Sequence, residues 1–213
     1  ALPNPVILEI LKEEGCGVDC SSHTELMLAE ALGFKGHEIM FSSNVTPHED
    51  YVYANRLGGI INLDDFSDID LLSSLMELPD TLCLRYNPGG SFSIHNDIMD
   101  KPGDAKYGMT KAQLIEGIKI LARRGVKHFG IHAFLASNAG TNEYYPTLAC
   151  ILFELALEIK NETGVSLSFI NLSGGVGIAY KPDAPENDIA LIGALVKEKF
   201  HEILTPAGLS DVA

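Results

Sequence analysis

The chain has 213 residues, 46% of them hydrophobic and 21% charged, a composition typical of one globular domain with a sizeable core. Its 29 acidic and 15 basic residues give a net charge of -14, so the long-range field repels nucleic acids and anionic membranes. No apolar run approaches the roughly 18 residues of a membrane span and no signal segment is recognisable, so we expect a cytoplasmic protein without nucleic-acid or membrane partners.

Short β-prone segments and helical patterns alternate along the chain. Helices are expected to begin at or near Pro5, Ser22, Thr46, Ser67 and Thr110, with two more over residues 148–159 and 189–200. Strands are expected at residues 17–21, 38–43, 59–63, 81–87, 128–135 and 167–172. Ser22 with Glu25 three residues later forms a capping-box pattern, and Ser67 is expected to cap the fourth helix.

This alternation predicts an α/β fold with a parallel sheet, either closed as a barrel or doubly wound. The chain opens and closes on helices and has one helix more than it has strands. We therefore expect a (β/α)8 TIM-type barrel that is incomplete, with six strands and seven helices and with the first and last strands missing.

Polar residues gather at or just past the carboxyl ends of the predicted strands, the rim that carries the chemistry in barrel enzymes. Each one alone is better explained by a helix cap or an Asx-turn, but as a set they favour a site. They are Asp19, Ser42, Asn44, Asn62, Arg85, Asn87, His132, Ser137, Asn138, Asn171 and Ser173. The four cysteines and seven histidines lack metal-ligand spacing, so no metal is expected.

The sixth predicted strand runs into Ser173-Gly174-Gly175-Val176-Gly177. Adjacent glycines after a strand offer bare backbone N–H groups at close range, which is a common way to bind a phosphate. The same pattern is also typical of a turn that needs positive φ.

Five motifs together resemble the fold-type III pyridoxal-phosphate-dependent decarboxylases, and most of all the diaminopimelate decarboxylases. In chain order they are residues 1–5, residues 17–26, Arg85-Tyr86-Asn87-Pro88-Gly89, Lys106-Tyr107-Gly108-Met109 and residues 173–180. The resemblance implies that residues 1–213 are the pyridoxal 5'-phosphate-binding barrel of a longer enzyme that also has a β-domain and is a homodimer. It places the Schiff-base lysine just before Ala1, so no catalytic residue is expected within this segment, which alone should be inactive.

The resemblance also implies the cofactor contacts. Gly174, Gly175 and Gly177 would give backbone amides to the phosphate, and Ser137 would donate a hydrogen bond to it. A second set, for which a helix cap or a barrel ion pair is the alternative, would line the inner wall near the cofactor: Asp19, Glu25 and Arg85.

One position departs from the family pattern. Phe134 stands where the family has a histidine over the cofactor ring, and a phenyl ring stacks but donates no hydrogen bond. His132 points to the same side of the strand, since strand side chains alternate. It either enters the site from deeper in the barrel or is a core histidine.

The implied activity is decarboxylation of an amino-acid substrate, with meso-diaminopimelate to L-lysine favoured, a step of lysine biosynthesis. Ornithine, arginine and carboxynorspermidine are the alternative substrates. Two other classes stay open: a non-catalytic homologue that binds or regulates a partner, and a different barrel enzyme that binds a phosphorylated metabolite.

Overall fold

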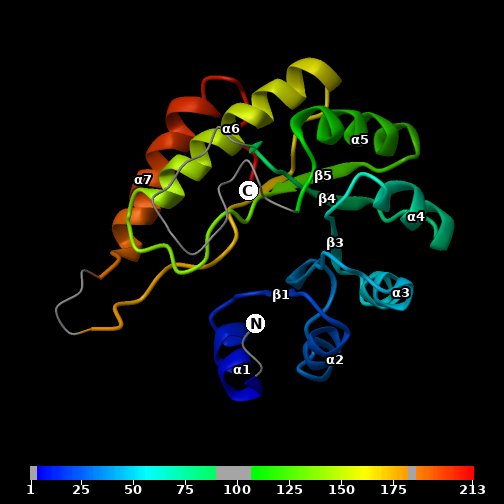
Figure 1. The fold of residues 1–213 in the computed structure, drawn as a ribbon, viewed down its shortest axis with the longest axis horizontal. Helices are drawn as coiled ribbons and strands as arrows, with labels where there is room; N and C mark the ends of the chain where they lie inside the picture. Colours follow the sequence, from blue (N-terminus) through cyan, green and yellow to red (C-terminus); the bar gives the residue numbers. More distant parts are fainter. Residues whose placement is uncertain (1–3, 90–106, 182–185) are drawn as a thin grey trace.

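The computed structural model describes residues 4–89, 107–181 and 186–213. Six parallel strands form one sheet in the order of the chain, so every strand pairs with its sequence neighbours. The strands are β1 (Val18–Cys20), β2 (Ile39–Ser42), β3 (Ile60–Leu63), β4 (Thr81–Arg85), β5 (His128–His132) and β6 (Phe169–Asn171). The sheet curves into part of a barrel (Figure 1).

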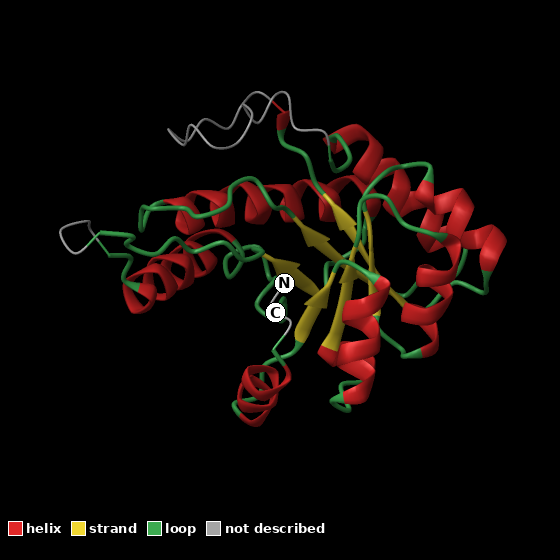
Figure 2. Ribbon diagram, turned by 60° about the horizontal axis from the view of Figure 1, so that its bottom comes forward, coloured by secondary structure: helices red, strands yellow, loops and turns green. Residues whose placement is uncertain are grey.

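Seven α-helices occur in the described residues, and Figure 2 shows them along the outside of the curved sheet. They are α1 (Pro5–Glu13), α2 (His23–Ala31), α3 (His48–Arg56), α4 (Asp68–Leu75), α5 (Lys111–Arg123), α6 (Tyr144–Thr163) and α7 (Ile189–Ile203). A short 3-10 helix, η1 (Gly36–Glu38), precedes β2. The predicted incomplete barrel of six strands and seven helices is thus confirmed, and none of the helices described is long and apolar enough to cross a membrane.

The strands are shorter than predicted, mostly at their carboxyl ends. Residues 86–87 and 133–135 lie outside the regular strands, although Tyr86 bridges to Met109 and its amide still donates to the carbonyl of His132. At the carboxyl ends of these strands, irregular backbone therefore replaces the regular ladder. Polar residues lie there, at the rim of the barrel. Two of the motif segments noted above fall partly outside the described residues, at residues 1–3 and at Lys106.

Helix caps agree with the sequence at α2 and differ at α4. Ser22 accepts a hydrogen bond from the amide of Glu25, as predicted, but the Glu25 carboxylate binds the amide and hydroxyl of Ser21 instead of returning to Ser22. Ser67 is the N-cap residue of α4, as predicted, but its side chain makes no capping hydrogen bond. Its hydroxyl donates to Asp65, and Asp68 accepts the amides of residues 64 and 65 instead.

The two faces of the sheet differ in polarity. On the outer face, Phe41, Ile61 and Leu84 are fully buried in the core that the helices cover. The inner face carries Asn62 and His132 among its buried side chains. Side chains along a strand point alternately to the two faces of the sheet. The apolar residues therefore face the helices, and the polar residues between them face the inside of the barrel.

One inner position requires glycine. Gly130 pairs with Phe169 in the ladder, and a Cβ at residue 130 would lie 2.1 Å from the Phe169 ring. The tip of the ring therefore occupies the space that a side chain at residue 130 would take. Any side chain at residue 130 would displace it.

Beyond β6, the ladder is extended by a single residue. The amide of Ile170 donates to Ala213, and the amide of Ala213 donates to Ser168. At the other end of the sheet, α1 carries exposed apolar side chains, among them Val6 and Ile10, and buries none.

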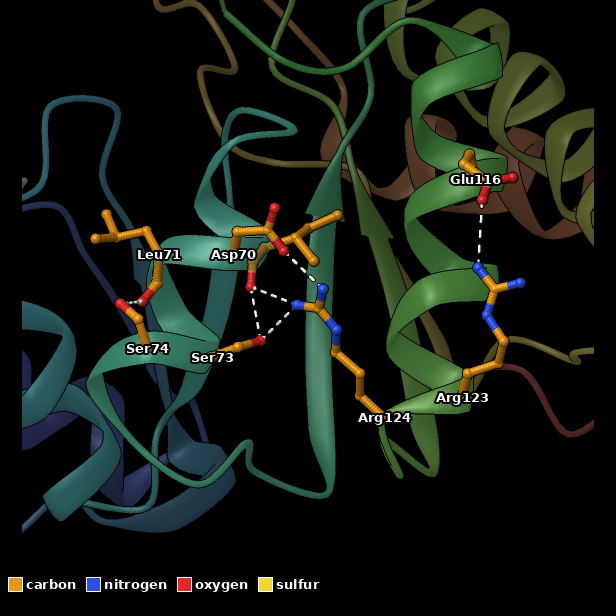
Figure 3. A network of polar contacts seen from close by, with 8 residues as sticks. Asp70, Leu71, Ser73, Ser74, Glu116, Arg123 and Arg124 are labelled. Carbon is orange, nitrogen blue, oxygen red and sulfur yellow. Dashed lines mark hydrogen bonds and ion pairs between the residues drawn. The ribbon is translucent and has the colours of Figure 1, made fainter.

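Helices α4 and α5 are joined by a polar network around Arg124, which follows α5. Its guanidinium donates to the Ser73 hydroxyl at 2.7 Å, to the Asp70 carboxylate at 2.6 Å and to the carbonyl of Ile69 at 3.3 Å. Figure 3 shows this arrangement and also the neighbouring Arg123, which reaches only Glu116 of its own helix.

Candidate functional site

The glycine loop after β6 lies against the loop that follows β5. The amide of Ala139 donates to the carbonyl of Gly175, and the amide of Gly177 donates to the carbonyl of Ala139, both at 2.8 Å. Asn187 adds a brace, because its side-chain amide donates to the carbonyls of Ala139 and Gly177 at 2.8 Å. The two loops therefore form one rigid unit at the carboxyl ends of neighbouring strands.

Gly175 is the residue of closest approach within this unit. Its φ is +102°, and a Cβ there would lie 3.0 Å from the carbonyl oxygen of Ala136, 3.4 Å from Cα of Ser137 and 3.5 Å from the ring of Phe134. The structure thus brings together three residues that the sequence predicts for one site, namely Gly175, Ser137 and Phe134. Only glycine fits this conformation without strain.

The three predicted glycine amides have different surroundings. Within the described residues, the amides of Gly174 and Gly175 have no hydrogen-bond partner. The amide of Gly177 is already bonded to Ala139, so in this structure it fixes the loop and is not directed at an anion. A Cβ on residue 177 would lie 2.7 Å from the same carbonyl oxygen. Close packing therefore explains why this residue is a glycine.

Arg85 lies at the carboxyl end of β4 and is held on three sides. Its guanidinium is 2.8 Å from the Asp64 carboxylate, 3.5 Å from the carbonyl of Phe134 and 5.3 Å from the centre of the Tyr107 ring. The contact with Phe134 links the inner wall to the glycine unit. A guanidinium held in this way presents a fixed positive charge at the rim.

Asp64 is a site residue that the sequence analysis missed. It follows β3 and is buried, and burial raises the pKa of its carboxyl, while Arg85 and the backbone of Gly108 oppose the rise. The available signal was its position two residues after Asn62, because alternation places both on the inner side. The partner could not be read from sequence, since it depends on how β3 and β4 are aligned.

Asp19 lies on β1 and faces the open interior of the incomplete barrel. The pKa of its carboxyl is raised to about 6, mainly by desolvation and also by the charge of Glu25, while the nearby Ser42 hydroxyl and the charge of Arg85 oppose the rise. Glu25 and Arg85, the other two predicted wall residues, therefore both lie within electrostatic reach of Asp19. Glu25 itself is bonded to Ser21, which places it at the start of α2.

His132 pairs with Arg85 in the ladder between β4 and β5 and is only 4% exposed. Its Nδ1 lies 3.1 Å from the side-chain nitrogen of Asn62. Burial and, to a smaller extent, the charge of Arg85 lower the pKa of His132 to about 3, so the imidazole is neutral at physiological pH. The structure places this histidine inside the barrel wall, two residues before Phe134.

These residues define what the site can do chemically. Two unpartnered amides and a serine stand beside an aromatic ring, which suits a ligand that carries an anionic group and a flat ring. A fixed arginine and a carboxyl with a raised pKa line the wall below. Among the described residues, no group of three or more metal-ligating side chains occurs.

The fold and this arrangement define a (β/α) barrel domain in which the loops after β5 and β6, here called the glycine cradle, pack together around Gly175. The family to which the chain belongs is the pyridoxal-dependent decarboxylases, since the model of their pyridoxal-binding domain matches residues 1–212. The cofactor of this domain is pyridoxal 5'-phosphate, and the cradle fits it because it offers amides for a phosphate next to a phenyl ring.

Curated relatives agree with this assignment. The chain is 34% identical over 202 residues to Protein TabA of Pseudomonas amygdali pv. tabaci, covering 95% of this chain and 47% of that protein. It is 29% identical to the diaminopimelate decarboxylase of Thermoplasma acidophilum, covering 92% and 48%. The chain therefore spans about half the length of these relatives.

The fold is shared with solved structures. The diaminopimelate decarboxylase of M. jannaschii, crystallised in co-complex with L-lysine, superposes with a TM-score of 0.81 at 23% identity. The match covers 94% of this chain and 48% of that one. The incomplete barrel is thus the same fold as the corresponding half of that enzyme.

Proposed function

We propose that this chain is the cofactor-binding barrel of a pyridoxal-phosphate-dependent amino-acid decarboxylase, acting on meso-diaminopimelate to give L-lysine and carbon dioxide. The observation that carries the proposal is the juxtaposition of Gly175 with Ser137 and Phe134 across two neighbouring loops. Because the relatives are about twice as long, the activity is proposed for the whole protein that contains this domain.

The cofactor, when bound, accepts the electron pair left as carbon dioxide departs from the amino acid. The chain's own residues bind and orient it. The amides of Gly174 and Gly175 and the hydroxyl of Ser137 would hold the phosphate, and Phe134 would lie against the ring. This assigns the phosphate to two amides, since the third predicted donor, Gly177, is bonded to Ala139.

Arg85 and Asp19 would set the electrostatics beside the cofactor. Arg85 cannot swing away, because Asp64 and the Phe134 carbonyl hold its guanidinium. Asp19 changes charge near pH 6, so the wall loses a negative charge in mild acid.

Similarity to diaminopimelate decarboxylases supports the assignment of meso-diaminopimelate as the substrate. Two observations favour keeping a second candidate function. Protein TabA, which is 34% identical, does not bear a decarboxylase name, and Phe134 replaces the histidine that the family places over the ring. The second candidate is therefore a decarboxylase of another basic amino acid, or a non-catalytic homologue that binds the cofactor.

The test is carbon dioxide release by the full-length protein loaded with pyridoxal phosphate. Diaminopimelate, ornithine, arginine and carboxynorspermidine are compared at equal concentration, with the cofactor-free protein as control. The proposal predicts release from meso-diaminopimelate above the other three. Preference for another basic amino acid would assign that compound as the substrate. Cofactor binding without carbon dioxide release from any of the four would indicate a non-catalytic homologue.

A homodimer and a cytoplasmic location belong to the same proposal, and the resemblance to the family supports both. Light scattering on the full-length protein tests the first. A monomer at micromolar concentration would remove the dimer from the account.

A further inference from the structure

The backbone that leads into the glycine cradle is tied to a distant strand through Asn171, the last residue of β6. The side-chain oxygen of Asn171 accepts a hydrogen bond from the amide of Ser173 at 2.7 Å. Its side-chain nitrogen donates to the sulfur of Met40, on β2, at 2.9 Å. Because β2 and β6 are not neighbours in the sheet, the second contact crosses the interior of the curved sheet.

These two contacts fix the orientation of the Asn171 amide. A backbone N–H only donates, so the atom that faces Ser173 must be the oxygen. The thioether sulfur of Met40 only accepts, so the atom that faces it must be the nitrogen. The backbone of Asn171 is held as well, because this residue pairs with His132 in the ladder and its carbonyl accepts from the amide of Ala133.

Ser173 has an unusual backbone conformation for a residue with a Cβ. Its φ is +66°, in the left-handed region, and Asn138 is the other non-glycine residue with a positive φ in the described part of the chain. In this region the Cβ crowds the following carbonyl oxygen, so a local contact has to stabilise the conformation. The hydrogen bond from the Ser173 amide to the side chain two residues earlier is such a contact, an Asx-turn.

The conformation of Ser173 sets the direction of the amides that follow it. φ is +66° at Ser173 and +102° at Gly175, while Gly174 between them lies outside the left-handed region. Backbone that changes handedness from one residue to the next turns successive N–H groups toward one side, and such groups of amides bind anions. The amides of Gly174 and Gly175 have no hydrogen-bond partner among the described residues, so both are available to a ligand.

We propose that Asn171 is a positioning residue that holds Ser173 in the left-handed conformation and so directs the amides of Gly174 and Gly175 at the cofactor phosphate. The inference rests on the proposed function, because it takes the phosphate of pyridoxal 5'-phosphate as the anion. Asn171 acts through the backbone of Ser173 and does not itself contact the phosphate. Without its side chain, only the molecules in which Ser173 is left-handed can bind, and the apparent affinity falls by that fraction.

The experiment compares Asn171→Ala in three backgrounds of the full-length protein: wild type, Ser173→Gly and Ser173→Ala. Fluorescence titration gives the affinities for pyridoxal phosphate and for pyridoxal, which lacks the phosphate. Glycine enters the left-handed region without a Cβ penalty, so Ser173→Gly should remove the need for Asn171. Ser173→Ala keeps the Cβ and removes the hydroxyl, so the need for Asn171 should persist.

In the wild-type and Ser173→Ala backgrounds, Asn171→Ala should weaken pyridoxal phosphate binding by roughly fivefold to thirtyfold, the factor that corresponds to the strain of a left-handed residue. In both it should weaken pyridoxal by less than about twofold. In the Ser173→Gly background the loss for pyridoxal phosphate should also be less than about twofold. An equal loss in all three backgrounds, or no loss in any, would overturn the proposal.

Thr163→Ala is the matched control. The Thr163 hydroxyl accepts the amide of Val165, two residues later, at 3.0 Å, in a turn that precedes the amino end of β6. Removing this acceptor should leave the preference for pyridoxal phosphate over pyridoxal unchanged. If Asn171→Ala does not fold, Asn171→Leu, which keeps the volume and removes the acceptor, carries the same expectations.

A second measurement needs no cofactor and separates this inference from the proposed function. NMR of the protein with 13C,15N-labelled serine reports the φ of Ser173 through the coupling between its amide and α hydrogens, and Ser173→Ala identifies the signal. We expect a positive φ in the cofactor-free wild type and its loss in Asn171→Ala. Equal affinity of the wild type for pyridoxal phosphate and pyridoxal would contradict the phosphate site of the proposed function. An unchanged φ in Asn171→Ala would overturn the positioning role of Asn171.

Discussion

The guanidinium of Arg85 lies 2.8 Å from the carboxylate of Asp64, and both side chains are largely buried, at 13% and 9% exposure. Removing one member of such a pair leaves the other charge without compensation. Asp64→Asn should therefore lower the free energy of unfolding by on the order of 3 kcal/mol, measured by urea denaturation. Arg85→Gln together with Asp64→Asn should cost less than the sum of the single changes. Strictly additive costs would show that the two residues do not interact.

The raised pKa of Asp19 makes the free energy of unfolding depend on pH. Its carboxyl has a pKa of about 6 in the folded protein against an ordinary value of 3.8, so the folded state binds the proton more tightly. Its contribution is favourable below about pH 4 and is lost as the pH rises toward 6. Asp19→Asn should remove this loss, so that the melting temperature gained over wild type is larger at neutral pH than in acid.

Asp65 is the comparison for that titration, because hydrogen bonds from Ser67 lower the pKa of its carboxyl. Asp65→Asn should give the opposite sign, costing stability at neutral pH and little in acid. An equal gain from Asp19→Asn at all pH values would argue against a raised pKa.

Arg124 and Arg123 are adjacent and offer a matched pair. Arg124 joins α5 to α4 through Asp70, Ser73 and the carbonyl of Ile69, whereas Arg123 makes one exposed contact with Glu116 at 3.4 Å (Figure 3). Arg124→Ala should lower the free energy of unfolding by about 1 kcal/mol, and Arg123→Ala by a few tenths at most. Equal effects in chemical denaturation would mean that the network adds nothing beyond a surface ion pair.

The ring of Phe134 is expected to contribute to the affinity for the cofactor. Phe134→Ala should weaken pyridoxal phosphate binding roughly threefold to tenfold, because an aromatic contact contributes about 0.5–1.5 kcal/mol. Phe134→His, which keeps an aromatic ring at this position, should retain most of the affinity. Phe153→Leu, in the α6–α7 contact with Phe200, is the control and should leave affinity unchanged. If Phe134→Ala binds as well as wild type in a fluorescence titration, the ring does not face the cofactor.

Much of the fold follows from local sequence, because strand alternation and helix starts are local signals. The period of two that buries Phe41 and Ile61 also brings Asn62 to the inner wall, and the glycines after β6 mark the rim. Partners across strands were not predictable. The pairing of Arg85 with Asp64 depends on strand register, and no local pattern specifies it.

Competition between neighbouring groups explains the remaining differences. Ser67 has the right residue type for a cap, but Asp65 takes its hydroxyl and Asp68 takes the amides. Gly177 has the spacing of a phosphate loop, but the loop after β5 uses its amide. In both cases a tertiary or local contact decided between two chemically reasonable partners.

The most direct test of the account is the effect of Gly175→Ala on the affinity of the full-length protein for pyridoxal phosphate and for pyridoxal, which lacks the phosphate. Gly125→Ala is the control, because Gly125 has nearly the same φ, +101°, in an open turn away from the site. We predict that Gly175→Ala weakens pyridoxal phosphate by roughly tenfold or more and pyridoxal little, while Gly125→Ala changes neither. An unchanged preference for the phosphorylated form in folded Gly175→Ala would contradict the assignment of this loop as the phosphate cradle.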